Sequence, residues 1–485
     1  MCLSSRSDRL TSQEAAVAEI EAVDGAGFEA GCDVLVIGAG AAGLIAALKA
    51  QEAGATVLVV ERDAVARGST ALSAGLVPAA ETRFQREAGI ADSKAGFAAD
   101  ILAKAHGEPD PEAVALVVDQ VGGVLEWLAD RHGLPFSVID NFTYPGHSAR
   151  RMHGLPSRSG AELMDRLRTA AEAAGIDIVT EATATTLFAD GDRIVGAGLL
   201  RPDGAEDRIG CKALVLACNG YGGNPDLVAA HIPALKDALY FGHPGNRGDA
   251  LLWGEALGAA TRHLSGHQGH GSVAHPHGIL ITWATITEGG IQVNRDGVRF
   301  ANEARGYSES AAAVIAEPDG IAFTIFDGRI AAIARQFEDF RAAETAGAVL
   351  TADTIAGLAG RMHVPEAALA ATLGEIAALK TAGATDRFGR DFAGVAQLAP
   401  PYAAVKVTGA LFHTQGGLVV DDRARVMRRD GRPFETLFAA GGAACGVSGA
   451  DAGGYLSGNG LLTAFAYGAL AGLGAARAAG AGAPA

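Results

Sequence analysis

Three glycines and one acid have the types and spacing that bind a dinucleotide: Gly38, Gly40, Gly43 and Glu61. Gly38 permits a tight turn, Gly40 lets the backbone approach a pyrophosphate, and Gly43 allows a helix to pack closely on a strand. The carboxylate of Glu61 can accept hydrogen bonds from a ribose. We therefore predict a dinucleotide site in which a helix N-terminus faces the phosphates.

The elements that must position these residues can be read from the sequence around them. The apolar run 34–37 predicts a strand, the Ala-rich stretch 41–53 a helix, and the run 57–60 a second strand. A further buried strand is predicted to run into the Gly-rich turn within 212–224. The other elements predicted in this half are strands at 176–181 and 193–200, a turn and edge strand at 203–209, a helix at 159–174 and a helix that begins at Gly248-Asp249.

The middle of the chain differs in composition from about residue 271 onward. It predicts strands at 279–286, a strand pair at 290–301 and helices at 308–316 and 365–381. After 411 the sequence again resembles the part before 271. It predicts a strand at 436–442 that can complete the first sheet and a last helix at 459–478. The expected fold class is α/β: a discontinuous Rossmann-like nucleotide-binding domain with an inserted α+β cap. The predicted divisions are an N-terminal extension at 1–30, the nucleotide-binding domain at 31–270 and 411–478, the cap at 271–410 and a frayed tail, Ala/Gly-rich from 474, that ends the chain at 479–485.

Composition excludes several classes of protein. A net charge of −16 on 485 residues argues against a nucleic-acid surface. No charge-free apolar run near the ~20 residues of a membrane span is evident, and residues 1–30 do not resemble a secretory signal. Residues 11–23 predict a short amphipathic helix. The five cysteines form no CxxC pair, which favours reduced thiols and a cytoplasmic location.

A run of histidines lies early in the predicted cap: His263, His267, His270, His275 and His277. Their spacings and the absence of nearby Cys or acid clusters do not fit a zinc site, so we predict no metal and a role in lining a pocket. Trp283 and Phe412 are further candidates for an apolar pocket wall.

Several blocks together resemble one family. They are 38–43 with Glu61, 213–224, 293–303, 412–417, 436–442 and 455–461. In order and spacing the chain resembles the FAD-dependent fumarate reductase and succinate dehydrogenase flavoprotein superfamily. The resemblance implies FAD as the dinucleotide and chemistry at the flavin face, between the cap and the nucleotide-binding domain. Covalent members carry a His in the loop that is 67–75 here; because this loop has none, non-covalent FAD is implied.

The resemblance also implies which residues contact FAD. They are Gly38, Gly40, Ala42, Gly43, Glu61, Arg62, Ser69, Thr70, Ser73, Ala217, Gly220, Asp249, Gly442, Asn459, Leu461 and Leu462.

The chain departs from the fumarate-reducing members at two arginines that clamp a dicarboxylate in those proteins. Their positions are Tyr307, five residues after Asn302, and Tyr455 in Tyr-Leu-Ser-Gly-Asn. The 3-ketosteroid dehydrogenases of the superfamily look similar at both places. The Tyr-x-Ser spacing of Tyr455 and Ser457 resembles the branch that introduces the 4-ene into 3-keto-5α-steroids.

This resemblance implies an FAD-dependent desaturase that forms a C=C bond next to a ketone, with hydride passing to flavin N5 and a proton to a tyrosine. Tyr455 with Ser457 is expected as base and relay, provided the pKa of the phenol is lowered, and Tyr307 as the donor to the ketone; the two tyrosines can exchange roles. The backbone N–H near Asn459 or Gly460 is expected to stabilise the enolate oxygen. His413 matches the substrate-binding His of the fumarate reducers, and either contacts a substrate oxygen or orients its loop.

Three alternatives remain. The first is a desaturase of smaller cyclohexanones or oxo-carboxylates, for which Arg150, Arg151, Arg158 and Arg305 leave room for a carboxylate. The second is an ene-reductase that works like fumarate reductase. The third is an electron-transfer subunit, which no iron–sulfur or haem motif supports. The expected partners are a small carbonyl substrate and an unidentified electron acceptor (oxygen, quinone or a carrier).

Overall fold

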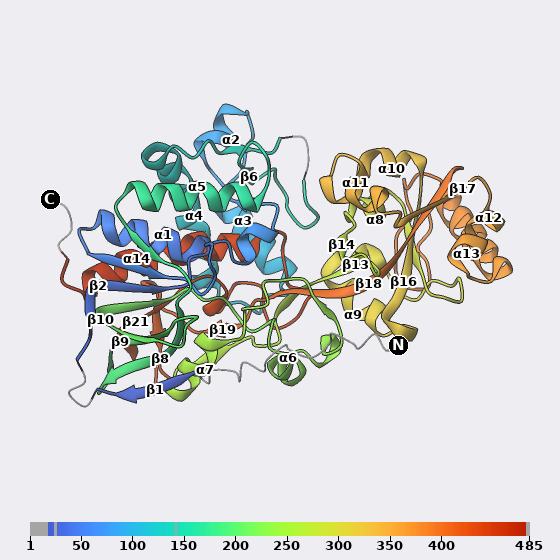
Figure 1. The fold of residues 1–485 in the computed structure, drawn as a ribbon. Helices are drawn as coiled ribbons and strands as arrows, with labels where there is room; N and C mark the ends of the chain where they lie inside the picture. The colour runs from blue at the N-terminus through green and yellow to red at the C-terminus, as the bar shows by residue number, and fades with distance from the viewer. Residues whose placement is uncertain (1–17, 24–26, 141–142, 482–485) are drawn as a thin grey trace, which may run out of the picture.

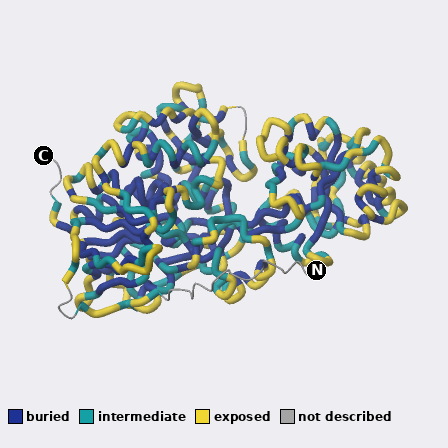
Figure 2. The backbone as a smooth tube through the Cα atoms, in the orientation of Figure 1, coloured by how far each residue is buried: buried dark blue, intermediate teal, exposed yellow. Residues whose placement is uncertain are grey.

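The computed structural model describes residues 18–23, 27–140 and 143–481. The chain forms two bodies, each built on its own sheet (Figure 1). The larger body contains both the first and the last elements of the chain, and the cap is inserted between them. Figure 2 shows that buried backbone follows the two sheets, whereas the outer helices and loops carry most of the exposed residues.

Five parallel strands form one part of the larger sheet, which ends at β7. Their order is β21 (Pro433–Ala439), β10 (Glu206–Leu216), β2 (Ala30–Ile37), β3 (Val57–Val60) and β7 (Asp177–Val179). The sheet thus joins β2 and β21 through β10 although the two strands lie at opposite ends of the sequence. The prediction that a C-terminal strand completes the first sheet is confirmed.

Three more strands extend this sheet on one side, and they change two predictions. β9 (Arg193–Leu200) pairs antiparallel with β10 and with β8 (Thr183–Asp190), and β1 (Glu19–Ala22) pairs parallel with β8. β10 pairs with β9 alone over 206–208 and with β2 as well from Ile209 on, so the strand predicted at 203–209 is the beginning of a longer strand that continues to Leu216. β8 was not predicted. The predicted helix at 11–23 is wrong where β1 lies, and its first residues, 11–17, fall outside the described part of the chain.

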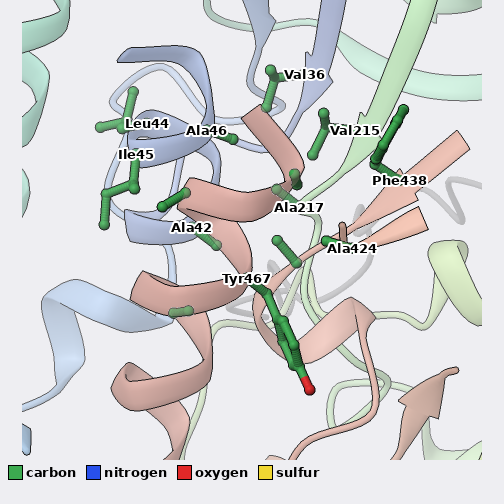
Figure 3. Packing of buried hydrophobic residues seen from close by; sticks show 14 of the residues in the cluster. Val36, Ala42, Leu44, Ile45, Ala46, Val215, Ala217, Ala424, Phe438 and Tyr467 are labelled. Carbon is green, nitrogen blue, oxygen red and sulfur yellow. The ribbon is translucent and has the colours of Figure 1, made fainter. Parts of the chain in front are cut away.

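Two small-residue helices meet in the core of the larger body. α1 (Ala41–Glu52) packs against α14 (Asn459–Ala478), and a Cβ on Gly468 would lie 2.7 Å from the carbonyl oxygen of Ala42 (Figure 3). α14 is long and apolar enough to cross a membrane by length and composition, contrary to the reading of the sequence, but 72% of that window is buried inside the fold. The helix also continues through residues 474–478, so the predicted fraying from 474 is wrong.

The cap is built on a seven-stranded sheet. Its strands are β14 (Ile279–Leu280), β13 (His267–Ala274), β18 (Tyr402–Thr414), β16 (Ile321–Asp327), β15 (Ile291–Val293), β11 (Leu239–Tyr240) and β17 (Val349–Ala352). β13 and β18 each cross a predicted domain boundary, at 271 and 410, so the boundaries stay a prediction. Helices α9 (Tyr307–Ile315) and α13 (Glu366–Ala382) match the prediction. The strand pair at 290–301 is wrong, because β15 pairs with β16, and α8 (Ala284–Thr287) replaces the end of the strand expected at 279–286.

The remaining elements connect and cover the two sheets. The helices are α2 (Arg83–Glu87), α3 (Lys94–Lys104), α4 (Pro111–His132), α5 (Gly160–Ala173), α6 (Pro225–His231), α7 (Asp249–Ala256), α10 (Gly328–Ala334), α11 (Glu338–Thr345) and α12 (Ile355–Met362). The short strands are β4 (Val77–Pro78), β5 (Ser137–Val138), β6 (Met152–Gly154), β12 (Thr261–Arg262), β19 (Gly417–Leu418) and β20 (Arg425–Met427).

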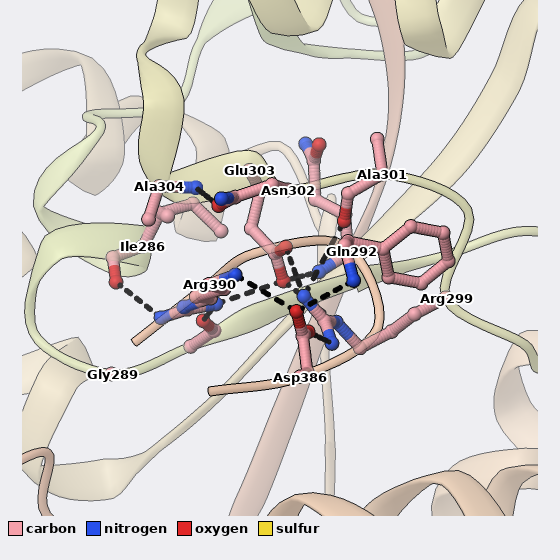
Figure 4. A network of polar contacts seen from close by, with 12 residues as sticks. Ile286, Gly289, Gln292, Arg299, Ala301, Asn302, Glu303, Ala304, Asp386 and Arg390 are labelled. Atoms are coloured by element: carbon pink, nitrogen blue, oxygen red, sulfur yellow. Dashed lines mark hydrogen bonds and ion pairs between the residues drawn. The ribbon is translucent and has the colours of Figure 1, made fainter. Parts of the chain in front are cut away.

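Four buried charges hold the loop that leads to α9 (Figure 4). The Glu303 carboxylate lies 2.6 Å from Arg299 Nη2 and 2.8 Å from Arg390 Nη1. Asp386 forms a second ion pair with Arg299. This charge cluster, defined as Arg299, Glu303, Asp386 and Arg390, ties the segment before Tyr307 to the chain beyond α13.

The cysteines in the described part of the chain are free: Cys32, Cys211, Cys218 and Cys445. Burial raises the pKa of Cys218 to about 12, so this thiol stays protonated at neutral pH. Cys2 falls outside the described residues.

Candidate active site

A cavity of about 1060 Å³ runs from the turn after β2 into the cap. Its walls include the β2–α1 turn, the loop 68–76, the start of α14 and cap residues as far as α11. One continuous space therefore joins the predicted dinucleotide site to the predicted catalytic residues.

The turn after β2 has the shape that the glycine spacing predicts. Gly38 has φ +102°, and a Cβ there would lie 2.5 Å from the carbonyl oxygen of Ala217. A Cβ on Gly43 would collide with the carbonyl oxygen of Gly38. At Gly40 the nearest atom to a Cβ is Thr70 Oγ1 at 3.9 Å, so that Cβ would project into open cavity. The N-cap residue Gly40 has no side chain to cap α1, and the one side-chain contact at this end among the described residues is the long bond from the Ala41 amide to Thr70 Oγ1 at 3.4 Å, so the first turn can still receive an anion.

Glu61 lies at the end of β3, where a ribose is expected. Its Oε2 accepts from the backbone N–H of Ala39 at 2.9 Å, and its Oε1 from that of Asp63 at 3.1 Å. These bonds fix the carboxylate at the wall of the cavity and leave further lone pairs for a ligand. The neighbouring Arg62 donates to the carbonyl of Gly245 at 3.0 Å, which ties this strand end to the segment after β11.

The hydroxyl-bearing loop 68–76 is largely bonded within the protein. Ser69 Oγ accepts from the Asn246 side chain at 2.8 Å, and Ser73 Oγ donates to the carbonyl of Thr70 at 2.7 Å. Thr70 Oγ1 accepts from the backbone N–H of Ala41 at 3.4 Å, a long contact at the start of α1. Of the three, Thr70 lies nearest to the expected phosphate position.

A second helix, α14, also begins at the cavity without a side-chain cap. Its N-cap is Gly458, at φ +91°, and Gly460 in its first turn lines the cavity. Two uncapped helix N-termini in one cavity fit the two electron-rich parts of FAD, the pyrophosphate at α1 and the flavin pyrimidine edge at α14.

The predicted cofactor residues divide into two groups. Those that line the cavity are Gly38, Gly40, Ala42, Glu61, Arg62, Ser69, Thr70, Ser73, Ala217, Asp249, Gly442 and Leu461. Those behind the wall are Gly43, Gly220, Asn459 and Leu462, where Gly43 and Gly220 allow close backbone packing and Leu462 lies in the core.

The residues predicted to be catalytic come together from both bodies. Tyr307 begins α9 in the cap, and its hydroxyl lies 2.8 Å from Ser457 Oγ in the loop before α14. The rings of Tyr307 and Tyr455 meet edge to face at 6.5 Å between centroids, and Tyr455 meets His413 at 5.3 Å. The structure thus places Ser457 on Tyr307, whereas the sequence predicted it as the relay of Tyr455.

An aromatic wall completes this end of the cavity. The His270 imidazole stacks on Tyr307 at 5.1 Å and on Phe412 at 5.5 Å, and meets Trp283 edge on at 5.5 Å.

Within the described residues no group of three or more Cys, His or acidic side chains could hold a metal ion. His270 was foreseen only as one of five pocket-lining histidines; nothing in its spacing distinguished it.

Burial keeps these side chains uncharged. Burial raises the pKa of Tyr307 and of Tyr455, although the Ser457 hydroxyl lowers the first and the amides of Gly460 and Gly458 lower the second. Burial lowers the pKa of His413 to about 4 and that of His270 to about 3. The expected net lowering of a phenol pKa is therefore not produced by the protein groups alone.

Two further expectations are corrected. The backbone N–H of Asn459 donates to the carbonyl of Leu456 at 3.0 Å, so Gly460 is the remaining backbone candidate for an oxyanion donor. Arg151 is fully buried against Asp92 and Asp100 and is not available to a substrate carboxylate. Of the four arginines proposed for that role, Arg158 lines the cavity, whereas Arg150 and Arg305 are exposed elsewhere.

Two site residues were missed by the sequence reasoning. Tyr144 lines the cavity from a segment without periodicity, and no sequence signal pointed to it. Gln415 contacts His413, with 3.0 Å between Nε2 and Nδ1. Its place in His-Thr-Gln-Gly-Gly was a usable signal, because an amide only two residues from an imidazole, just beyond the end of β18, is within reach of the ring.

Comparisons with known proteins agree with this geometry. A family model described as an FAD binding domain matches residues 33–461. The chain is 30% identical over 449 residues to a probable fumarate reductase of Shewanella frigidimarina (92% of this chain, 74% of that protein). It is 28% identical over 526 residues to 4-oxocyclohexanecarboxylate 2-dehydrogenase of Sinomonas cyclohexanicum (87% and 90%).

Solved structures show the same fold. The open conformation of a flavocytochrome c3 fumarate reductase superposes with a TM-score of 0.81 at 30% identity, covering 94% of this chain and 80% of that one. The 3-ketosteroid-Δ4-(5α)-dehydrogenase of Rhodococcus jostii, in complex with 4-androstene-3,17-dione, superposes with a TM-score of 0.74 at 25% identity, covering 94% and 99%. The chain therefore belongs to the FAD binding domain family, as an FAD-dependent oxidoreductase of the fumarate reductase and succinate dehydrogenase flavoprotein superfamily.

Proposed function

We propose that the protein desaturates the C–C bond next to the ketone of a cyclic substrate, a 3-ketosteroid or another cyclic ketone. The observation that carries this proposal is the contact of Tyr307 with Ser457 beside Tyr455. Both tyrosines stand where fumarate-reducing members place arginines. Phenols suit a neutral ketone better than a dicarboxylate, which needs guanidinium partners.

Bound FAD supplies the hydride acceptor. The chain's own residues handle the proton and the ketone oxygen. Tyr455 lies at the positive end of α14, where the amides of Gly458 and Gly460 favour its phenolate, so we assign it as the base for the α-proton. Tyr307, polarised by Ser457, and neutral His413 donate hydrogen bonds to the ketone oxygen as it gains charge.

The aromatic wall favours a substrate with an apolar ring body. Trp283, His270 and Phe412 form this wall beside Tyr307, and Leu280 and Phe337 line the cavity farther out. Arg158 on the same cavity favours a second candidate, a smaller cyclic ketone that carries a carboxylate, in keeping with the 4-oxocyclohexanecarboxylate dehydrogenase among the relatives.

The 30% identity to a probable fumarate reductase favours the reverse reaction, reduction of a C=C bond next to a carbonyl, as a third candidate. The same groups serve both directions. In reduction Tyr455 gives a proton to the α-carbon, and its raised pKa keeps the phenol protonated before this step.

Anaerobic bleaching of the flavin tests the proposal. The purified protein is mixed with 3-ketosteroids, cyclohexanones, 4-oxocyclohexanecarboxylate and dicarboxylates. We expect at least one cyclic ketone to bleach the flavin without a partner protein, and succinate to leave it oxidised. Rapid reduction by succinate, or rapid reoxidation of the reduced flavin by fumarate, would overturn the proposal.

We also propose that FAD is held without a covalent bond, because the loop 67–75 carries no His. Acid precipitation should release all of the flavin into the supernatant. Flavin that stays with the pellet would contradict this assignment.

A further inference from the structure

We propose that Gln415 is a positioning residue that fixes the tautomer of His413, at the end of a buried series of hydrogen bonds that begins at Asn459. The role of this series is to present the Nε2–H of His413 to the substrate oxygen. The inference rests on the proposed function for the identity of that oxygen, but the tautomer itself is a property of the holoenzyme and can be measured without turnover.

Three hydrogen bonds form the series, and all point the same way. Asn459 Nδ2 donates to Ser448 Oγ at 3.0 Å, and Ser448 Oγ donates to Gln415 Oε1 at 2.7 Å. Gln415 Nε2 then donates to His413 Nδ1 at 3.0 Å. Asn459, Ser448 and Gln415 are 0%, 1% and 5% exposed, so water does not compete for these bonds.

The chemistry of the amide decides where the proton of His413 lies. An amide nitrogen only donates, so Nδ1 must accept, and the neutral ring carries its proton on Nε2. Burial, which lowers the pKa of His413 to about 4, keeps the ring neutral at pH 7. The Nε2 edge lies over the first turn of α14, 3.2 Å from where a Cβ on Gly460 would stand. Nε2 has no hydrogen-bond partner among the residues that the structure describes.

The opposite sense of the series is less favourable. If both amides turned over, Nδ1–H of His413 would donate to Gln415 and the series would end by placing the amide NH₂ of Asn459 without a partner. In the observed sense the group left over is Asn459 Oδ1, a buried carbonyl with no partner. A buried carbonyl without a partner is better tolerated than a buried N–H. The backbone carbonyl of Thr414 lies 3.4 Å from Nδ1, farther than the amide of Gln415.

The two senses give the Nε2 atom of His413 opposite roles at the cavity. In the observed sense Nε2–H stabilises negative charge on a ketone oxygen without giving up its proton. In the opposite sense a lone pair would face that oxygen and repel it. A substitution that selects the sense at Gln415 should therefore change the reaction rate while His413 itself stays in place.

Gln415→Glu is the decisive variant, since a carboxylate accepts from Nδ1–H and reverses the tautomer. We expect the rate of flavin reduction by the active ketone to fall about a hundredfold at pH 8, as for loss of one oxyanion donor. The carboxylate also raises the pKa of His413, so the rate should recover as the pH falls and the ring carries a proton on both nitrogens. Gln415→Met, which has no strong hydrogen-bonding group there, should lose less than about tenfold and show no such recovery.

Nitrogen-15 NMR of histidine-labelled holoenzyme reads the tautomer directly. We expect an Nε2–H ring for His413 in the natural protein and an Nδ1–H ring in Gln415→Glu, with FAD content unchanged. Gln397→Glu makes the same charge change at an exposed site and is the control. An Nδ1–H ring in the natural protein, or a Gln415→Glu rate within twofold of it, would overturn the inference. If no ketone bleaches the flavin but the tautomers are as expected, the proposed function fails and the assignment of Gln415 stands.

Discussion

Two regions of the cap lie four residues apart in the chain and treat buried polarity in opposite ways. The charge cluster around Glu303 buries two guanidinium groups and two carboxylates in direct contact. The site at Tyr307 buries phenols and imidazoles, which burial keeps neutral. Buried charges are therefore found next to the site, whereas the side chains of Tyr307 and Tyr455 are neutral.

The charge cluster has a structural role, whereas the neutral site has a chemical one. Paired buried charges gain little net stability over apolar residues, but they hold one geometry because breaking them is costly. Glu303 also accepts from the backbone N–H of Gln292 at 3.2 Å, so the cluster fixes the start of α9 against β15. A neutral site has no fixed charge of its own, and its hydrogen-bond donors act fully on charge that develops during the reaction.

The largest expected effect comes from breaking the charge cluster. Glu303→Gln leaves Arg299 and Arg390 with reduced neutralisation in a buried site, so the free energy of unfolding should fall by about 3–5 kcal/mol. Urea unfolding of the holoenzyme measures this change. Glu435→Gln removes an exposed partner of Arg193 and should cost less than about 1 kcal/mol. Equal losses in the two variants would show that the cluster does not hold the cap.

The second effect concerns the neutral site and should leave stability nearly unchanged. Tyr455→Phe removes the assigned base, so reduction of the flavin by the active ketone should slow at least about a hundredfold while FAD stays bound. Stopped-flow bleaching measures the rate. Tyr467→Phe is the matched control, because Tyr467 is a buried tyrosine of α14 that does not line the cavity. A near-normal rate in Tyr455→Phe would remove it from the mechanism.

The sequence predicted the elements whose periodicity and glycines are strong. The turn at Gly38, the strand–helix–strand around it and the start of α14 followed from local pattern and the family resemblance. The pairing of strands that are far apart in the chain was harder to predict. The sequence did not show that β10 is one long central strand, because its partners β2 and β21 come from distant parts of the chain.

The candidate active site, too, could be predicted from the sequence only in part. Spacing brought Tyr307 and Tyr455 to the same place, and the structure confirms that they meet. It did not predict that Ser457 would contact Tyr307, because that contact depends on how the cap sits over the loop before α14. The series from Asn459 to Gln415 joins three segments of the larger body and cap by side chains alone, and no local pattern encodes it.

The smallest expected effect is on the pH dependence of the free energy of unfolding, in which the two regions should differ. Burial lowers the pKa of His270 to about 3, against about 6.5 in an unfolded chain, so the unfolded state binds more protons between these values. His270 therefore contributes stability above pH 6.5 that is lost as the pH falls below it. Between pH 7 and pH 5 this loss is about 2 kcal/mol, and His270→Gln should reduce the pH dependence of urea unfolding by that amount.

The charge cluster should respond differently over the same range. Burial by itself would raise the pKa of Asp386. The hydrogen bond from Arg299, with the other groups that favour the carboxylate, outweighs burial and holds this pKa below its usual value of 3.8. Asp386 is therefore ionised in both the folded and the unfolded state at pH 7, and largely so at pH 5. Asp386→Asn should lower the free energy of unfolding by nearly the same amount at both pH values, whereas the effect of His270→Gln should depend on pH. If the two variants showed the same pH dependence, the contrast between a charged support and a neutral site would not hold.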